Sequence, residues 1–293
     1  MLAYVFPGQG SQYKGMGKAL FAEFSTLCAL ADDVLGYSIR QLCLEDPQQQ
    51  LNQTRYTQPA IYVVSALSYV QWLEQSSKKA DFLAGHSLGE YTALFAAGVF
   101  DFATGLQLVK KRAELMAQAN AGGMAAVMGI TVPQIRQLLQ EQQFHHIEVA
   151  NYNSASQTVL SGDLTELRRA VEVFSQHKAR CVLLPVSAAF HSRFMQDAEQ
   201  RFAAYLQDVH FQPPATPVIA NVTARPHQAP ALRETLARQI TAPVQWHAGV
   251  DYLLAQGVTE FKELGPGNVL SKLVSTIQAA AVPAPAAELP AVV

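Results

Sequence analysis

The chain has 293 residues, of which 49% are hydrophobic and 15% charged, and its formal net charge is −2. This composition excludes a disordered tail and a fibrous protein, and the length suffices for one large domain or two lobes. The longest basic run is Lys110-Lys111-Arg112; this is too little positive charge for a nucleic-acid-binding face, so small-molecule or protein partners are favoured.

The cysteines and the N-terminus indicate a soluble protein. Cys28, Cys43 and Cys181 form no C-x-x-C pair, and no metal-ligand spacing is present, so we expect reduced, buried thiols and no bound metal. Residues 1–6 are too short for a signal peptide, and no stretch approaches the ~18 apolar residues of a membrane span. We therefore expect a cytoplasmic protein without membrane association.

Changes in the period of the apolar pattern mark the elements of the first 122 residues. A short apolar run that stops at Pro7-Gly8 is typical of a buried strand, and apolar residues at helical spacing predict helices. The expected elements are a strand at residues 2–6, a helix at 20–35 closed by Gly36, a helix at 59–75 with Pro59 in its first turn, a strand at 82–84, a helix ending near Ala97, and a helix with an apolar stripe from Phe102 to Met116.

The apolar pattern changes after residue 122, and the first pattern returns near residue 188. The middle segment predicts the order β-α-β-β-α-β, with strands at 124–130, 147–152, 158–161 and 181–186 and helices at 132–143 and 164–177. This order is the split pattern of a ferredoxin-like unit. The first pattern returns with helices at 195–206, 231–240, 250–256 and from Val269, and strands at 218–221 and 259–264.

The economical interpretation is an α/β protein whose large domain is interrupted by a small one. The large domain, with a parallel sheet, would span residues 1–122 and 188–278, and the inserted domain residues 123–187. Residues 279–293 are rich in alanine and contain three prolines. Because proline disfavours a helix interior, we expect this segment to be an extended tail or linker.

A candidate nucleophile lies between an expected strand and an expected helix. Gly85-His86-Ser87-Leu88-Gly89 is a G-x-S-x-G motif, in the context that a nucleophile elbow requires. The glycines would avoid collisions in the tight turn, and the following helix would direct its N-terminal amides towards negative charge near Ser87. An ordinary Gly-Ser turn is the alternative interpretation.

A serine nucleophile needs a base, and His191 is the best placed of the eight histidines. It follows the last strand of the expected insert, where the chain returns to the large domain. The side chain of His86, adjacent in the turn, is expected to diverge from Ser87. A packed or solvated loop histidine is the alternative for His191. No acidic residue between Ser87 and His191 lies at a convincing strand end, so we expect a Ser–His pair that something other than a carboxylate orients.

Two further features surround this pair. The loop Pro7-Gly8-Gln9-Gly10-Ser11-Gln12 resembles the start of a dinucleotide fingerprint, but Tyr13 occupies the third glycine position. Such a loop can instead offer backbone N–H groups to an oxyanion. Arg112 is three residues after Val109 and so shares the buried side of its helix; a solvated basic turn is the alternative.

Several separated motifs across residues 1–278 resemble the malonyl-CoA:acyl carrier protein transacylase family. They are Phe6-Pro7-Gly8-Gln9-Gly10-Ser11-Gln12, Thr57-Gln58-Pro59-Ala60, Gly85-His86-Ser87-Leu88-Gly89-Glu90-Tyr91, Arg112 with Met116, Asn151-Tyr152-Asn153-Ser154, Ala189-Phe190-His191-Ser192, Pro243-Val244-Gln245-Trp246 and Glu263-Leu264-Gly265-Pro266-Gly267. Residues 37–40, 81–87 and 186–195 look most like the free-standing, trans-acting acyltransferases of polyketide synthases. The resemblance implies an α/β-hydrolase-like domain with a ferredoxin-like insert.

The resemblance also implies catalytic roles. Ser87 would take the acyl group as an ester, and His191 would act first as general base and then as general acid. The main-chain N–H groups of Gln9 and Leu88 would form the oxyanion hole. The backbone carbonyl of Gln245 would orient His191.

Substrate contacts follow from the same resemblance. Arg112 would hold the free carboxylate of malonate by a bidentate, charge-assisted pair, with Gln9 and Asn153 as nearby polar contacts. Phe190 would restrict branching at the α-carbon, although one methyl changes pocket affinity by only about 1–3 kcal/mol. Malonyl rather than methylmalonyl is therefore expected.

The implied reaction needs malonyl-CoA as donor and, as acceptor, the phosphopantetheine thiol of an acyl carrier protein or a carrier domain of a polyketide synthase. It would serve polyketide or fatty acid synthesis, with no permanently bound cofactor and with the enzyme as a monomer. One alternative is an editing hydrolase of the same fold, which would gain nothing from a buried Arg112. Another is a non-catalytic carrier-protein docking module, which would tolerate loss of Ser87 or His191.

Overall fold

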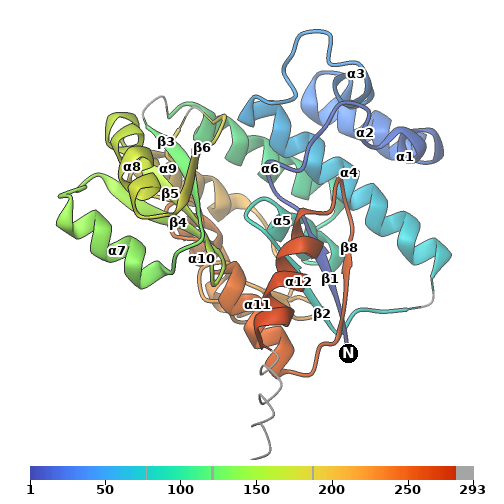
Figure 1. Cartoon of the computed structure of the whole chain (residues 1–293). Coiled ribbons are helices and arrows are strands. Elements are labelled where there is room, and N and C mark those ends of the chain that lie inside the picture. Colours follow the sequence, from blue (N-terminus) through green and yellow to red (C-terminus); the bar gives the residue numbers. More distant parts are fainter. Residues whose placement is uncertain (77, 120–121, 187, 282–293) are drawn as a thin grey trace, which may run out of the picture.

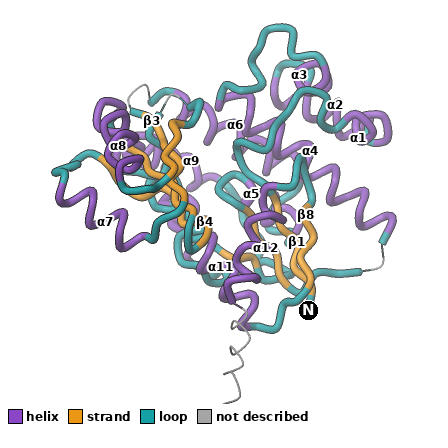
Figure 2. Tube along the Cα trace, in the orientation of Figure 1, coloured by secondary structure: helices purple, strands orange, loops and turns teal. Residues whose placement is uncertain are grey.

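The protein is described by a computed structural model that covers residues 1–76, 78–119, 122–186 and 188–281. Its strands form two four-stranded sheets, which lie in separate parts of the molecule (Figures 1 and 2). The limit expected at residue 187, and residues 282–293 of the expected tail, lie outside the described residues. None of the described helices is both long and apolar enough to cross a membrane.

The sheet of the large domain is parallel, as expected, with the order β7-β2-β1-β8. Its strands are β1 (Leu2–Phe6), β2 (Phe82–Gly85), β7 (Val218–Ile219) and β8 (Glu260–Glu263). Phe6 pairs with Gly85 at the ends of β1 and β2. Because parallel strands end at the same edge, the loop after Phe6 and the turn after Gly85 meet there.

Side chains of β1 point alternately to the two faces of this sheet, and each face is covered by its own layer of helices. Successive side chains of a strand point to opposite faces. Tyr4 and Phe6 belong to the larger core, and Ala3 and Val5 to a second core with the C-terminal helices. The larger core is formed with α1 (Lys18–Glu23), α2 (Ser25–Leu35), α3 (Ile39–Leu44), α4 (Thr54–Gln75), α5 (Gly89–Ala96), α6 (Phe102–Ala117), α9 (Gln196–Tyr205) and α10 (Leu232–Arg238), and the second with α11 (Trp246–Ala255) and α12 (Val269–Ala281).

Several helices differ from the sequence-based expectation; for example, the helix expected at 250–256 begins at Trp246. The single helix expected at 20–35 breaks at Phe24, whose φ of −107° and ψ of 49° are not helical. The helix expected from Pro59 begins at Thr54, so Pro59 lies inside it rather than in its first turn. Polar residues of the first helical turns conceal this start from a hydrophobic-period argument. The short helix α3, which Ser38 caps by accepting from the Gln41 N–H, was not predicted.

The inserted unit has the expected order β-α-β-β-α-β and forms an antiparallel sheet, β4-β5-β3-β6. Its elements are β3 (Gly123–Met128), α7 (Val132–Glu141), β4 (Ile147–Ser154), β5 (Gln157–Gly162), α8 (Leu164–Gln176) and β6 (Arg180–Leu183). One face of the sheet packs against α7 and α8. On the other face, Met124, Ala126 and Val159 join the core of the large domain, so this face closes over the carboxyl edge of the parallel sheet.

Candidate active site

Ser87 occupies a strained turn between β2 and α5. Its φ is +51°, in the left-handed region that a non-glycine residue seldom adopts. The flanking glycines permit the turn: a Cβ on Gly85 would lie 1.9 Å from the Gly89 backbone, and one on Gly89 would lie 2.0 Å from the Phe6 carbonyl oxygen. The turn therefore exposes the Ser87 side chain at the edge where β1 and β2 end.

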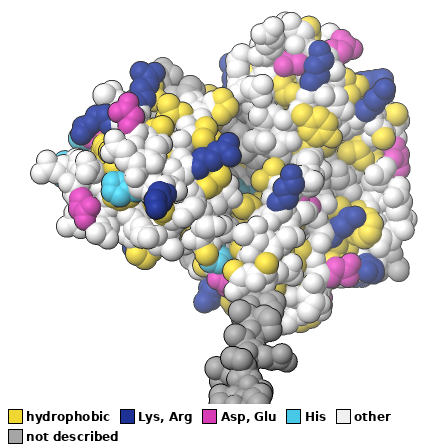
Figure 3. Space-filling model, in the orientation of Figure 1, with side chains coloured by type: hydrophobic (Ala, Val, Ile, Leu, Met, Phe, Trp, Pro, Cys, Tyr) yellow, Lys and Arg dark blue, Asp and Glu magenta, His cyan; other side chains and the backbone are white. Residues whose placement is uncertain are grey.

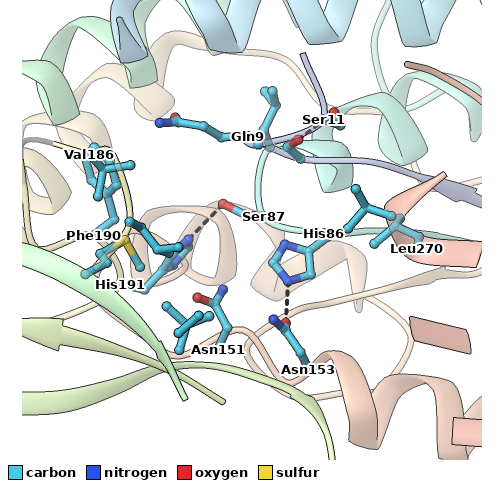
Figure 4. A pocket seen from close by; sticks show the side chains of 18 of the residues that line it. Gln9, Ser11, His86, Ser87, Asn151, Asn153, Val186, Phe190, His191 and Leu270 are labelled. Atoms are coloured by element: carbon cyan, nitrogen blue, oxygen red, sulfur yellow. Dashed lines mark hydrogen bonds between the residues drawn. The ribbon is translucent and has the colours of Figure 1, made fainter. Parts of the chain in front are cut away.

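The structure brings His191 to Ser87 although 104 positions separate them. Ser87 Oγ lies 2.8 Å from His191 Nε2 (Figure 4). His191 Nδ1 lies 2.8 Å from the carbonyl oxygen of Gln239 and 3.1 Å from that of Ala242. Because carbonyls only accept, Nδ1 carries the proton and Nε2 is free to accept from the Ser87 hydroxyl.

Burial, together with the nearby Arg112 and His86, lowers the pKa of His191 from its ordinary 6.5 to about 3. The imidazole is therefore neutral at physiological pH, which is the state that a general base requires. Like Ser87, His191 has a positive φ, +57°. Two residues in this uncommon backbone conformation thus face each other, which is typical of a functional site.

The expectation that the Gln245 carbonyl orients His191 is wrong. That carbonyl accepts from the Gly249 N–H at 2.9 Å and so belongs to the first turn of α11. Gln239 and Ala242 take its place. One signal in the sequence could have indicated this: the helical partner of the Gln239 carbonyl would be the N–H of residue 243, and Pro243 has none.

Arg112 lies on α6 with its guanidinium completely buried beside Ser87. Nη2 donates to Ser87 Oγ at 3.0 Å and to Gln239 Oε1 at 2.9 Å, and Nη1 donates to Gln58 Oε1 at 2.7 Å. Within the described residues no carboxylate forms an ion pair with it, and its Nε–H finds no partner. Burial lowers its pKa. A buried cation that contacts only neutral acceptors is a ready site for an anion.

The expected oxyanion donors lie next to the serine. Gln9 follows β1, Leu88 precedes α5, and both line the same cavity as Ser87. Among the described residues, neither main-chain N–H has a hydrogen-bond partner. The Gln9 side chain points elsewhere, and its Nε2 donates to Thr54 Oγ1 at 3.1 Å. The two N–H groups are thus available to a bound ligand.

A cavity of about 260 Å³ joins these groups, and both units of the fold line it. Phe190 and Asn153 lie in its wall, the latter on β4 (Figure 4). His86 points to Asn153, with 2.9 Å between His86 Nε2 and Asn153 Oδ1, rather than to Ser87. Hydrophobic side chains gather at the junction of the two units on the outer surface (Figure 3). The described residues contain no cluster of three His, Cys, Asp or Glu side chains fit for a metal ion.

Sequence reasoning missed three polar residues that hold this geometry. Besides Gln58 and Gln239 at Arg112, Asn221 clamps the turn: its Oδ1 accepts from the Ser87 N–H and its Nδ2 donates to the Gly85 carbonyl, both at 2.6 Å. Gln58 stood in a motif quoted only for its resemblance. Asn221 follows β7, and a polar residue at the carboxyl end of a parallel strand is a usable signal.

Comparison with known proteins agrees with this geometry. The family described as "Acyl transferase domain" matches residues 3–289. The polyketide biosynthesis malonyl CoA-acyl carrier protein transacylase PksC of Bacillus subtilis is 50% identical over 280 residues, covering 95% of this chain and 97% of that protein.

Solved structures extend this similarity. A malonyl CoA-acyl carrier protein transacylase from Burkholderia pseudomallei has a TM-score of 0.94 and 51% identity, covering 97% of this chain and 99% of that chain. A malonyl-transacylase solved with a type II PKS acyl-carrier protein has a TM-score of 0.90 and 37% identity, covering 94% of this chain and 92% of that chain. The chain belongs to the acyl transferase domain family and, within it, to the malonyl CoA-acyl carrier protein transacylases.

Proposed function

We propose that the protein transfers a malonyl group from malonyl-CoA, through an ester on Ser87, to the phosphopantetheine thiol of an acyl carrier protein. The observation that carries this proposal is Arg112: its buried guanidinium reaches the nucleophile itself, 3.0 Å from Ser87 Oγ, and has no carboxylate in contact within the described residues. An acyl group whose carboxylate is separated from Ser87 Oγ by two carbon atoms would complete the pair.

The first half of the reaction uses the Ser–His pair. His191 Nε2 accepts the hydroxyl proton while Ser87 Oγ attacks the thioester carbonyl. The N–H groups of Gln9 and Leu88 stabilise the resulting oxyanion. The C–S bond then breaks, and His191 returns its proton to the leaving thiolate of coenzyme A, which leaves malonyl-Ser87.

The second half reverses these roles. The carrier thiol enters the same cavity and gives its proton to His191, and its sulfur attacks the ester carbonyl. The C–O bond breaks and Ser87 Oγ recovers the proton, so the malonyl group leaves on the carrier. Gln239 and Ala242 keep the imidazole in one tautomer throughout, which is the orienting role that a carboxylate plays in hydrolases.

Substrate choice and partners follow from the same cavity. Phe190 beside His191 favours malonyl over branched acyl groups, and Asn153 offers a polar contact. The reaction takes its nucleophile, base and anion-binding group from Ser87, His191 and Arg112, and on this chemistry we propose a monomer that needs no permanently bound cofactor. The 50% identity to a polyketide-biosynthesis transacylase supports a role as a free-standing acyltransferase for a polyketide synthase.

Intact-protein mass spectrometry tests the proposal. Malonyl-CoA should add one malonyl group to the wild-type protein and none to Ser87→Ala. Ser11→Ala is the matched control, because Ser11 lines the same cavity but its hydroxyl donates to the Gly8 carbonyl rather than to a histidine. An adduct that persists in Ser87→Ala would place the nucleophile elsewhere.

The lifetime of the adduct separates transfer from editing hydrolysis. We expect malonyl-Ser87 to persist in buffer and to decay quickly when a carrier protein or a pantetheine thiol is added, because the burial of His191 limits the access of water to its imidazole. Equal decay with and without thiol would favour the editing hydrolase. Absence of any adduct would leave only the docking module.

A further inference from the structure

A buried carboxylate lies directly behind the Ser87 turn. Glu90 is the second residue of α5, and its side chain is inaccessible to solvent. Its Oε1 accepts from His227 Nε2 at 2.6 Å, in a pair whose two side chains are both fully buried. Its Oε2 accepts from the Asn221 N–H at 3.0 Å and from Gln239 Nε2 at 2.8 Å. Such a costly buried group needs all of these donors.

One branch of this network runs through Gln239. Since Glu90 can only accept, it binds the amide NH₂ of Gln239 and thereby turns Gln239 Oε1 towards Arg112. The same NH₂ donates to the Ser87 carbonyl at 3.0 Å, and the Gln239 carbonyl accepts from His191. Gln239 therefore touches the nucleophile, the base and the cation, and Glu90 sets which way its amide faces.

The second branch runs through Asn221. Glu90 binds the main-chain N–H of this residue, whose side chain bridges the Ser87 N–H and the Gly85 carbonyl. Asn221 thereby holds both ends of the strained turn. Glu90 thus reaches the nucleophile by two independent routes, each one residue long.

The intervening amide also separates two charges. Arg112 and Glu90 are both buried, yet Gln239 stands between them with one hydrogen bond to each. A carboxylate in direct contact would occupy the guanidinium and compete with a substrate carboxylate. Because Gln239 lies between them, Glu90 offsets the positive charge of Arg112 without contacting the guanidinium, which still lines the cavity.

We propose that Glu90, held by His227, is a positioning residue for acyl transfer that aligns Ser87, His191 and Arg112 through Gln239 and Asn221. The proposal rests on the proposed function. His227 takes part because its Nε2–H fixes the carboxylate. Its Nδ1 finds no partner among the described residues, so the pairing with Glu90 is the single hydrogen bond of its side chain there.

Glu90→Gln tests the carboxylate without changing its size. The amide introduced at this position can still accept from Asn221 and Gln239, and its NH₂ can donate to the other tautomer of His227, so the charge is lost and the hydrogen bond with His227 reverses its direction. We expect kcat for malonyl transfer to fall by about ten- to a hundredfold, by analogy with the range for residues that orient the ligands of a catalytic metal. KM for malonyl-CoA should stay unchanged or fall, because Arg112 loses its offsetting charge.

His227 and Thr92 supply the rescue and the control. His227→Gln retains a donor for Glu90 and should keep most of the activity, whereas His227→Leu should lose kcat as Glu90→Gln does. Thr92→Val changes another fully buried residue of α5, whose Oγ1 has no partner among the described residues, and should leave kcat and KM unchanged.

The outcomes are distinguishable. Wild-type protein that forms no malonyl adduct would overturn the proposed function itself. With an active wild type, a kcat of Glu90→Gln within twofold of wild type would overturn the role of Glu90. If kcat fell equally in His227→Gln and His227→Leu, the network would have only a structural role. The same would follow if kcat fell in Thr92→Val as much as in Glu90→Gln. Circular dichroism of each variant confirms that the folded protein is compared.

Discussion

Replacing Arg112 by alanine should change which acyl group the protein transfers. In the free protein the guanidinium contacts Ser87 Oγ, Gln58 Oε1 and Gln239 Oε1. The contact with Ser87 is available whichever acyl group is bound, so its loss affects malonyl and acetyl transfer alike. Only malonyl carries a carboxylate that loses its partner, and the ratio of the two rates isolates that contact.

The expected size follows from the burial of the site. A hydrogen bond to a charged group contributes about 1.5–3 kcal/mol, and removing one partner of a buried ion pair costs about 3–5 kcal/mol. A loss of about 3–4 kcal/mol in kcat/KM for malonyl-CoA is about 150- to 1000-fold. The kcat/KM for acetyl transfer should change by only a few fold. It should rise, because the positive charge of Arg112 opposes protonation of His191 and the variant lacks that charge.

Self-acylation and transfer to a carrier, followed by intact-mass spectrometry with malonyl-CoA and acetyl-CoA, measure this ratio. Met116→Ala is the matched control, because Met116 is one helical turn further along α6 and lines the same cavity without a charge. It should affect both substrates equally. Equal losses for malonyl and acetyl in Arg112→Ala would show that Arg112 only supports the structure, and would refute the reasoning above.

Four other expectations concern the base, the turn and the nucleophile. Because burial holds the pKa of His191 at about 3, the acid limb of kcat/KM should lie below pH 5; a limb near pH 6.5 would contradict this. The same shift penalises the folded state as pH falls below 6.5 towards 3, since the unfolded chain binds the proton first. Between pH 7 and 5 wild type should therefore lose about 2 kcal/mol more unfolding free energy than His191→Gln, measured by urea titration. Gly89→Ala should abolish acylation and destabilise the fold by about 3 kcal/mol or more, because its Cβ would lie 2.0 Å from the Phe6 oxygen; a thermally stable, active variant would show that the turn can relax. Esterification at Ser87 should be located by peptide mass spectrometry, and a label on any other residue would exclude the elbow.

The elements that the sequence predicted well are those in which local spacing and burial agree. Phe6 and Ala84 end short apolar runs that predict buried strands, and the structure confirms both strands and their parallel pairing. Gly85, Ser87 and Gly89 define a turn whose sequence signature lies in five consecutive residues, although the space beside Gly89 is limited by Phe6 of the neighbouring strand. Gly36 ends its helix in the left-handed conformation as predicted. In each case the signal that predicts the element lies within a few positions of the chain.

What the tertiary structure alone decided is how polar atoms distant in sequence meet. Gln239 was not singled out by its side-chain type, because its role depends on a carbonyl left free by Pro243 and on an amide that Glu90 orients. The Gln245 assignment failed for the same reason, since a main-chain carbonyl carries no residue signature and was already bonded within α11. Hydrophobic periodicity reports which face is buried, whereas hydrogen-bond partners depend on positions within a few tenths of an ångström. That is why the sequence predicted the pairing of Ser87 with His191, which the structure brings together, and only the folded chain determined what holds the two side chains in line.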